Sequence, residues 1–345
     1  MRKSLSTKLV SVIIPVHNGA STLHRCLEAL QQSTYRRWEA IVVDDRSDDG
    51  SAEIATAHGF RVLHGETGIR GPAMARNLGA RQAGGEILVF LDADVAVRAD
   101  TISELVATLQ QSPQIAACFG SYDAQPAAAN FLSQYKNLLH HYVHQTGRRE
   151  ATTFWAGCGA VRQDAFWGAG GFGGEYVEPS IEDIELGERL RGRGYVIRLA
   201  PHIQVTHLKQ WNARSLLRSD ILQRALPWSR LIVRRRVLHD DLNLGRRQRA
   251  SAIAAWTLSL GVVLLRFMPG AGLLIPLSVV ALLALNGGFY TFLVARRGLI
   301  FTAKALVWHW FYFLYSSAVF ALVLLAAGAS LIKNLPQRPP TTLSF

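Results

Sequence analysis

The last third of the chain contains no acidic residue. All 25 Asp and Glu residues lie at or before Asp241, so residues 242–345 carry nine basic residues and no carboxylate. The preceding residues, 1–241, carry 28 basic and 25 acidic side chains, a net charge of only +3. A nucleic-acid-binding protein typically has its basic excess on the folded domain, so the sequence argues against a nucleic-acid partner. The basic residues here border apolar segments, which indicates a membrane surface.

Cysteine is scarce as well. Cys26, Cys118 and Cys158 are odd in number and lack the spacing of a metal site, which excludes a disulfide-stapled fold and favours free thiols in a reducing compartment. The apolar run before Pro15 is too short for the core of a secretory signal, so we expect the N-terminal part to be cytosolic. A composition of 49% hydrophobic and 18% charged residues excludes a disordered chain.

Three apolar segments occupy the acid-free region, at residues 251–268, 271–294 and 305–332. A spanning helix needs about 20 apolar residues, so the second and third are long enough and the first is borderline. Basic residues precede the first segment and lie between the second and third, which by the positive-inside rule places residues 1–250 in the cytoplasm. We therefore expect a multi-pass protein of the cytoplasmic membrane with about three spanning helices over residues 251–332. The alternative is a buried helical hairpin in a soluble protein.

Residues 213–250 are expected to form a basic amphipathic linker at the membrane interface, and residues 333–345 a tail. Leucine and isoleucine recur at helical spacing between arginines over residues 213–235, as in an interfacial helix. The alternative is an ordinary helix packed on the soluble domain. Pro227 is expected to break this helix.

Residues 1–212 alternate between strand and helix patterns. Apolar runs at 9–14, 38–43, 59–63 and 87–91 predict buried strands of a largely parallel sheet, and helical patterns at about 20–33, 51–58 and 72–83 lie between them. This alternation predicts an α/β fold with a mostly parallel central sheet, which binds ligands at the carboxyl ends of its strands.

Acidic residues cluster at two of these strand ends. The second strand runs into Asp44 and Asp45, and the fourth runs into Asp92, Ala93 and Asp94. Two acids two residues apart repel each other unless a cation joins them. Mg²⁺ or Mn²⁺ carrying a diphosphate is the natural candidate, because such ions take carboxylate and phosphate oxygens together. A D-x-D triplet alone is a weak signal, since such triplets also cap helices.

Two further segments have the composition of turns that lead into helices. The first strand ends in a turn containing Pro15, His17 and Asn18, and a glycine-rich loop over residues 68–79 leads into a helix. Arg70 and Arg76 in that loop and helix could meet phosphate charge.

Seven motifs in order now carry a family resemblance: IIPVHNG, IVVDDRSDDGS, ARNLGA, ILVFLDADV, GCGAVRQDAF, GGFGGEY and IEDIELGERLRGRGY. Over residues 9–212 this series resembles the glycosyltransferase family 2 domain, with its Rossmann-type GT-A fold. The resemblance implies transfer of a sugar, with inversion, from a nucleotide-diphosphate donor. It implies that Asp45, with Asp44 beside it, contacts the nucleoside. It also implies that Asp92 and Asp94 hold Mg²⁺ or Mn²⁺, with Asp94 the more direct ligand.

The resemblance further implies a catalytic base in the acid pair Glu182 and Asp183, of which Asp183 is the first choice. Helical spacing after Asp183 places it near a helix N-terminus, where the dipole favours a carboxylate. The alternative is simple charge complementation of that helix by its acids. The expected donor-binding set is Pro15, His17, Asn18, Asp44, Asp45, Arg70, Arg76, Asn77, Asp92, Ala93 and Asp94.

His207 follows a late strand and could be a third metal ligand, although an ordinary polar residue at a strand end is the alternative. By resemblance, Gly157 and Cys158 lie on the acceptor side. Trp155 nearby could stack on a sugar or simply pack in the core. Arg224 and Trp228 resemble the Q-x-x-R-W element of processive polysaccharide synthases, but the spacing departs from it. We place both on the acceptor side.

The function that the sequence predicts is an inverting glycosyltransferase at the cytoplasmic face of the membrane. Its partners would be a nucleotide-diphosphate sugar and a lipid or polyprenyl-phosphate-type acceptor, because a donor-binding domain, a basic segment and apolar spans follow one another. The alternatives are a short-polymer polysaccharide synthase and a non-catalytic membrane scaffold of the same fold.

Overall fold

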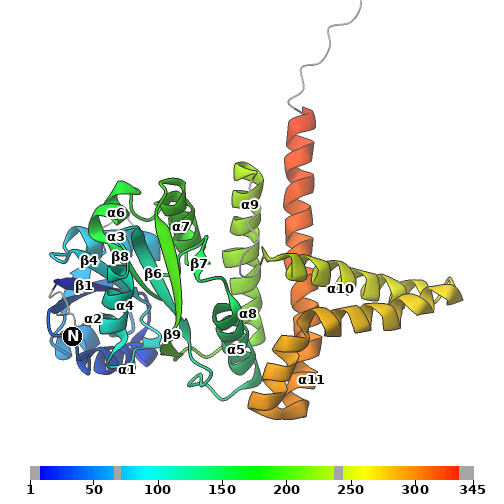
Figure 1. Cartoon of the computed structure of the whole chain (residues 1–345), viewed down its shortest axis with the longest axis horizontal. Helices are drawn as coiled ribbons and strands as arrows, with labels where there is room; N and C mark the ends of the chain where they lie inside the picture. Colours follow the sequence, from blue (N-terminus) through cyan, green and yellow to red (C-terminus); the bar gives the residue numbers. More distant parts are fainter. Residues whose placement is uncertain (1–7, 66–70, 237–243, 334–345) are drawn as a thin grey trace, which may run out of the picture.

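The computed structural model describes residues 8–65, 71–236 and 244–333. An α/β domain makes up the N-terminal part, and long helices that project away from it make up the C-terminal part (Figure 1). Arg70 and most of the expected tail lie outside the described residues.

The N-terminal half of the central sheet is parallel, as the apolar runs predicted. Strand β1 lies between β2 and β4, and β3 pairs with the far edge of β2. The core of β1 and all of β4 are buried, which fits strands covered by helices on both faces. Because Val16 pairs with Asp44 in the register, the carboxyl ends of the first two strands meet at one edge. The bounds are β1 (Val10–Val16), β2 (Trp38–Asp44), β3 (Arg61–His64) and β4 (Ile87–Leu91).

The second half of the sheet mixes directions. Strand β8 runs antiparallel to both β4 and β6, while β9 is parallel to β6, so β6 and β9 run in the same direction as β1 to β4 and the sheet is mostly parallel, as expected, with β8 reversed. The short strands β5 and β7 pair antiparallel with β9. The bounds are β5 (Val95–Ala96), β6 (Ile115–Tyr122), β7 (Glu150–Ala151), β8 (Cys158–Arg162) and β9 (Val196–His207).

Helices follow most strands of the domain, and the three predicted for its first third are present. Helix α3 packs on β1 and β2, and α4 packs on β6, β8 and β9. At α3 the packing is close, because a Cβ at Gly79 would lie 2.6 Å from the Ile13 side chain of β1. The bounds are α1 (Ala20–Gln31), α2 (Ser51–Ala57), α3 (Pro72–Arg81), α4 (Thr101–Gln110), α5 (Phe131–Thr146), α6 (Gln163–Gly168) and α7 (Glu182–Gly192).

A continuous helical segment links the domain to the apolar helices. It consists of α8 (Ala213–Arg218), the π-helix η1 (Ser219–Ala225) and α9 (Leu226–Arg235). The expectation that Pro227 breaks the helix is wrong. Pro227 lies in the first turn of α9, where a helix tolerates proline, and the wider π-helical turn directly precedes it.

The C-terminal helices are α10 (Arg246–Leu264), the 3₁₀ turn η3 (Pro269–Leu273) and α11 (Leu274–Lys333). Helix α10 packs along α11, and Arg297 of α11 donates to Gln134 of α5 and to the carbonyl of Ala124. Helix α11 is interrupted at Gly298, whose φ of 82° and ψ of 176° are open essentially to glycine alone. Figure 1 shows the direction change between the two halves of α11.

By length and composition, one helical stretch of the described residues, Pro269–Ala329, could cross a membrane. We expected three spans. Helix α10 begins with Arg246, Arg247 and Arg249, which shortens its uncharged part. The second and third expected spans are the two halves of α11, which meet at Gly298.

Candidate active site

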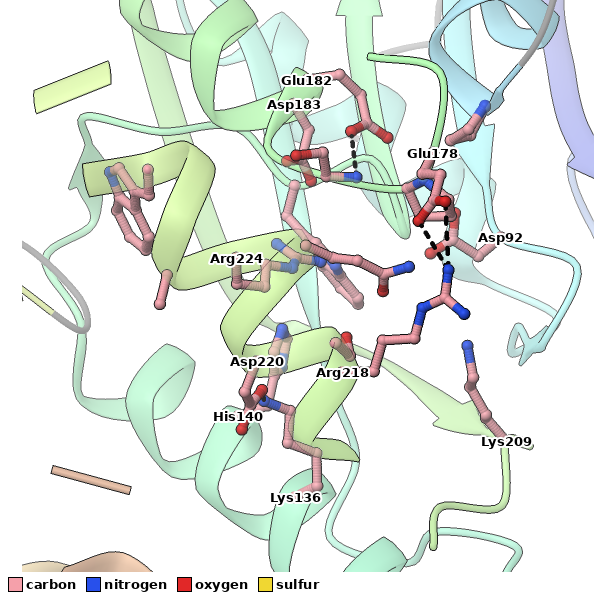
Figure 2. A pocket seen from close by; sticks show the side chains of 18 of the residues that line it. Asp92, Lys136, His140, Glu178, Glu182, Asp183, Lys209, Arg218, Asp220 and Arg224 are labelled. Carbon is pink, nitrogen blue, oxygen red and sulfur yellow. Dashed lines mark hydrogen bonds and ion pairs between the residues drawn. The ribbon is translucent and has the colours of Figure 1, made fainter. Parts of the chain in front are cut away.

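A cavity of about 1310 Å³ opens where the carboxyl ends of β1, β2 and β4 face α7, η1 and α9. Figure 2 shows side chains from the domain and from the linking helices around it. The cavity also reaches Phe313 and Phe320 of α11, so one space joins the α/β domain to the apolar helices. The sequence-predicted residues that line it are Pro15, His17, Asn18, Asp45, Arg76, Asp92, Ala93, Asp94, Trp155, Glu182, Asp183, His207, Arg224 and Trp228.

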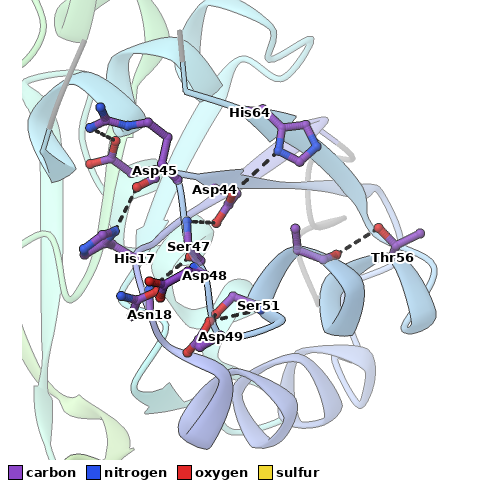
Figure 3. A network of polar contacts seen from close by, with 12 residues as sticks. His17, Asn18, Asp44, Asp45, Ser47, Asp48, Asp49, Ser51, Thr56 and His64 are labelled. Carbon is purple, nitrogen blue, oxygen red and sulfur yellow. Dashed lines mark hydrogen bonds and ion pairs between the residues drawn. The ribbon is translucent and has the colours of Figure 1, made fainter. Parts of the chain in front are cut away.

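Both carboxylate oxygens of Asp45 are fixed at the end of the cavity that the carboxyl ends of β1 and β2 form. Oδ2 accepts from the backbone N–H of Gly71 at 2.7 Å, and Oδ1 accepts from Arg46 at 3.2 Å. The ring nitrogen Nδ1 of His17 lies 2.8 Å from the backbone oxygen of Asp45, which ties the end of β1 to that of β2 (Figure 3). Asn18 accepts from the N–H of Asp48 at 2.9 Å. These contacts fix the turn after β1 against the loop that follows β2.

Two predicted donor-binding residues do not line the cavity. Asp44 is buried, and its Oδ1 accepts from the N–H of Ser47 at 3.2 Å. Its Oδ2 lies 3.6 Å from Nδ1 of His64 (Figure 3). The amide of Asn77 is satisfied at both ends by the backbone of Phe172, with contacts of 2.8 and 2.9 Å. Both side chains therefore hold loops in place.

Arg76 joins the two acidic motifs. Its guanidinium donates to Asp92 at 2.7 Å and to Glu182 at 2.8 Å, and the arginine is only 5% exposed. Glu182 also accepts from the N–H of Ser180 at 2.9 Å. We expected Arg76 to meet phosphate and Glu182 to assist the base. In the structure these two side chains form an ion pair with each other.

Asp94 faces a histidine and a lysine. Its Oδ2 lies 3.8 Å from Nε2 of His207 and 3.8 Å from Nζ of Lys209. Burial alone would raise the pKa of Asp94, but the imidazole and the ammonium outweigh burial and lower that pKa below its usual range. Tyr122 stacks on the His207 ring, with 4.2 Å between centroids. A carboxylate is therefore held ionised beside an oriented imidazole.

Asp94 and His207 fit a divalent cation as a partial site. A carboxylate and an imidazole suit Mg²⁺ or Mn²⁺, with Mn²⁺ the better match for nitrogen. Within the described ranges no group of three or more His, Cys, Asp or Glu side chains is arranged to hold a metal. The remaining ligands would thus have to come from the donor diphosphate and water. Asp92, the other expected ligand, also lines the cavity and accepts from Arg76 through Oδ1.

Asp183 lies at the start of α7, 6% exposed, on the wall of the cavity. Its Oδ2 accepts from the N–H of Ala156 at 3.2 Å. Burial raises the pKa of Asp183 to about 6, against the opposing charge of Arg224. A carboxylate in this range can accept a proton near neutral pH.

The expected acceptor-side residues divide into two groups. Trp155, Arg224 and Trp228 line the cavity, whereas Gly157 and Cys158 are buried beneath it at the start of β8. A Cβ at Gly157 would lie 2.6 Å from the Trp155 ring, so this glycine leaves room for the indole. Burial raises the pKa of the Cys158 thiol to about 12, which makes it an inert core group. All three cysteines are buried and free.

Sequence reasoning missed a buried link between the domain and α11. Asp220 of η1 forms an ion pair with Lys136 of α5, with 2.5 Å between the charged atoms. It also accepts a hydrogen bond from the hydroxyl of Tyr315 of α11 at 2.6 Å. It also missed the ion pair of Arg218 with Glu178 at 3.2 Å, at the rim of the cavity (Figure 2). The sequence could not predict either contact, because the paired residues lie 40 or more positions apart in the chain.

The comparisons bear on the same residues. Residues 11–169 match the family model described as "Glycosyl transferase family 2". These residues form a glycosyltransferase family 2 domain. The match covers β1 through α6 and therefore includes Asp45, Asp92 and Asp94 but ends before Asp183.

Curated relatives of the domain are glycosyltransferases. The chain is 33% identical over 147 residues to glycosyltransferase GlyG of Streptococcus pneumoniae, covering 41% of this chain and 45% of that protein. It is 33% identical over 221 residues to the pre-mycofactocin glycosyltransferase of Mycobacterium tuberculosis, covering 59% of this chain and 45% of that protein. The chain thus spans less than half the length of these two relatives.

A solved structure confirms the fold class. The mannosyltransferase PcManGT of Pyrobaculum calidifontis, solved with GDP-mannose and Mn²⁺, superposes with a TM-score of 0.50 and 19% identity, covering 95% of this chain and 88% of that one. At this identity the likeness concerns the fold alone.

Proposed function

We propose that the chain is an inverting glycosyltransferase that moves a sugar from a nucleotide-diphosphate donor to a membrane lipid or polyprenyl-linked acceptor. One observation carries this proposal. The cavity that holds Asp45, Asp94 and Asp183 continues between α10 and α11, where Phe313 and Phe320 line it. Gln248, Arg249, Ser316 and Ser317 line the same stretch. The aromatic side chains there would cover the tail of a lipid, which a soluble acceptor lacks.

The donor would lie along the carboxyl ends of β1, β2 and β4. Asp45, His17 and Asn18 would face the nucleoside, and the diphosphate would lie beside Ala93 and Asp94. A Mg²⁺ or Mn²⁺ ion held by Asp94 and His207 would supply positive charge for the leaving diphosphate. Arg76, which lines the cavity, would position Asp92 and Glu182 for this arrangement.

Asp183 would act as general base. It takes the proton of the acceptor hydroxyl while that oxygen forms a bond to the anomeric carbon from the face opposite the diphosphate. The bond from the anomeric carbon to the diphosphate oxygen breaks, and its electron pair leaves with the nucleotide, which inverts the configuration. The raised pKa of about 6 matches a base that works near neutral pH.

The acceptor would occupy the half of the cavity nearest α9 and α11. Arg224 lines the cavity close enough to Asp183 and Glu182 for their charges to raise its pKa, and its guanidinium could also bind an anionic head group there. Trp155 and Trp228 offer flat surfaces to a sugar or an isoprenoid. If the acceptor is a phosphate monoester, its oxygen is already ionised and the base becomes less important.

We further propose the organisation expected from the sequence: a transferase domain over residues 1–212, a basic interfacial linker over 213–250 and a membrane region over 251–332. The domain would face the cytoplasm. Support comes from the basic residues at the start of α10 and from Arg297, which contacts the domain at the end of the first half of α11.

The test is transfer in reconstituted vesicles. The full chain is incubated with radiolabelled UDP- or GDP-sugars, Mn²⁺ and polyprenyl phosphate or total lipid extract. One labelled lipid product carrying a single sugar is expected. A ladder of products would favour a short-polymer synthase, and the absence of transfer or hydrolysis across the donor panel would favour a non-catalytic scaffold.

A further inference from the structure

A second concave surface lies on the outer side of α9, away from the active site. It is a groove of about 520 Å³ between α9 and the second half of α11. Figure 1 shows α9 and this part of α11 running side by side. Its apolar wall includes Val233 of α9 and Val319, Val323 and Ala327 of α11. We call it the α9–α11 groove.

The other sides of α9 are already used by the enzyme. Trp228, Ser229 and Ile232 line the active-site cavity, and Leu231 packs against Ile184 of the domain. The groove side has no such partner within the described part of the chain. Helix α9 is therefore the wall between the active site and the groove.

Two arginines border the groove. Arg230 and Arg234 are four residues apart on α9, so they lie one turn apart on the same face. No hydrogen bond or ion pair links either guanidinium to another described residue, in contrast to Arg235, which lies 3.9 Å from Glu185. Two exposed guanidinium groups on one face are suited to a phosphate group, because each can offer two parallel N–H donors.

The groove combines two features that one ligand must match. Its apolar wall on α11 extends from Val319 to Ala327, about 12 Å at 1.5 Å per residue. A free phosphate or a soluble anion would leave this wall in water, whereas an acyl chain would cover it. The ligand must therefore join an apolar chain to an anionic head.

We propose that the α9–α11 groove binds one molecule of an anionic glycerophospholipid. An acyl chain lies along Val319, Val323 and Ala327, and the phosphodiester is bound by Arg230 and Arg234. This inference goes beyond the proposed function, because it concerns a lipid that is not a substrate. Since α9 also forms one wall of the active site, a lipid bound in the groove would hold that wall in place.

The test is native mass spectrometry of the full chain, delipidated in detergent and mixed with equal amounts of dioleoylphosphatidylglycerol and dioleoylphosphatidylcholine. The expected result is at least a tenfold excess of the singly phosphatidylglycerol-bound form. The double variant R230Q/R234Q is expected to reduce this excess to near parity. The matched control R235Q/R236Q removes the same charge from the last residue of α9 and the residue that caps it, and is expected to keep the excess. Equal preference in wild type and R230Q/R234Q would overturn the proposal.

Three further arms identify the ligand. Val323→Trp fills the groove without changing charge and should abolish the preference while the melting temperature of the protein stays within a few degrees. Inorganic phosphate in large excess should not displace the lipid; displacement would assign a simple anion site. If equimolar polyprenyl phosphate displaces phosphatidylglycerol completely, the groove belongs to the acceptor and the proposal is wrong. No sugar donor is present, so a failed transfer assay does not affect the outcome.

Discussion

Arg76 and Glu182 form a buried ion pair with 2.8 Å between Nη1 and Oε1, although they are 106 residues apart in the chain. The same guanidinium holds Asp92 at 2.7 Å. The pair therefore connects the strand end that would meet the donor with the helix start that would carry the base. A substitution at Arg76 or Glu182 should therefore disturb both the end of β4 and the start of α7.

Glu182→Gln is expected to destabilise the protein substantially. Removing one charge from a buried ion pair costs about 3–5 kcal/mol of unfolding free energy, because the partner charge is left uncompensated. Glu178→Gln is the matched control, since its ion pair with Arg218 is exposed and contributes at most about 1 kcal/mol. Thermal melting in detergent compares the two. Equal losses would show that Glu182 is not a structural anchor.

Asp183→Asn is expected to lower kcat by about 10²–10⁴-fold, the usual contribution of a general base. Donor affinity should stay within a few-fold of wild type, because the amide keeps the shape of the carboxyl group. The control is Glu185→Gln, which removes the same charge from the same turn of α7. If both variants lose activity equally, the acids act only by complementing the helix charge. Wild-type turnover by Asp183→Asn would remove the base assignment.

The pKa of Asp183 predicts opposite pH effects on activity and stability. The base must be ionised, so kcat should fall below about pH 6 in the wild type and lose this limb in Asp183→Asn. Burial disfavours the ionised form of Asp183 in the folded protein. The protonated side chain therefore contributes to the free energy of unfolding at low pH, and this contribution is lost as the pH rises through about 6. Asp183→Asn should therefore melt above wild type at pH 7, with the difference shrinking toward pH 4. A constant difference would contradict this.

Asp94→Asn is expected to remove the metal-dependent part of donor binding. Losing even a hydrogen-bond partner of a ligand typically weakens metal binding about 10–100-fold, and losing the ligand itself should cost more. Calorimetry of nucleotide-sugar binding with and without Mn²⁺ measures this, and EDTA should weaken the wild type in the same way. Asp48→Asn is the control, because Asp48 does not line the cavity. Unchanged affinity in Asp94→Asn would refute the metal assignment.

Tyr315→Phe is expected to loosen α11 from the domain. Its hydroxyl donates to the buried carboxylate of Asp220, and a hydrogen bond to a charged group is worth about 1.5–3 kcal/mol. The matched control is Tyr312→Phe, since the structure gives the Tyr312 hydroxyl no hydrogen-bond partner among the described residues. Melting temperature in detergent should fall for the first variant and change little for the second. Identical melting of both would show that the link to Asp220 is not stabilising.

Much of the fold could be predicted because its signals are local. The apolar runs that predicted β1 and β4 are continuous, and such runs are typical of strands buried on both faces. The direction of β8 could not be predicted, because a strand sequence does not encode which neighbour it pairs with. The π-helical turn before Pro227 was also missed, and its Asp220 pairs with Lys136, which lies 84 residues earlier in the chain.

In the candidate site, too, the sequence predicted which segments contribute residues but not which side chains line the cavity. Asp44 is the last residue of β2 and Asp45 is the first residue after it. Of the two, Asp45 lines the cavity, whereas Asp44 is buried and bonded to the backbone of Ser47, a difference that depends on how the following loop folds. Asn77 was expected at the donor because of its motif, but its amide is bound to the backbone of Phe172.

The sequence by itself determined where carboxylates follow buried strands and where uninterrupted apolar helices begin, because both depend on neighbours a few residues away. Only the tertiary structure decided that Asp45, Asp94 and Asp183 share one cavity, that Arg76 is occupied by Glu182, and that the cavity reaches α11. These relationships join residues that are tens to more than a hundred positions apart. Their geometry follows from how the sheet and helices pack, which no local pattern records.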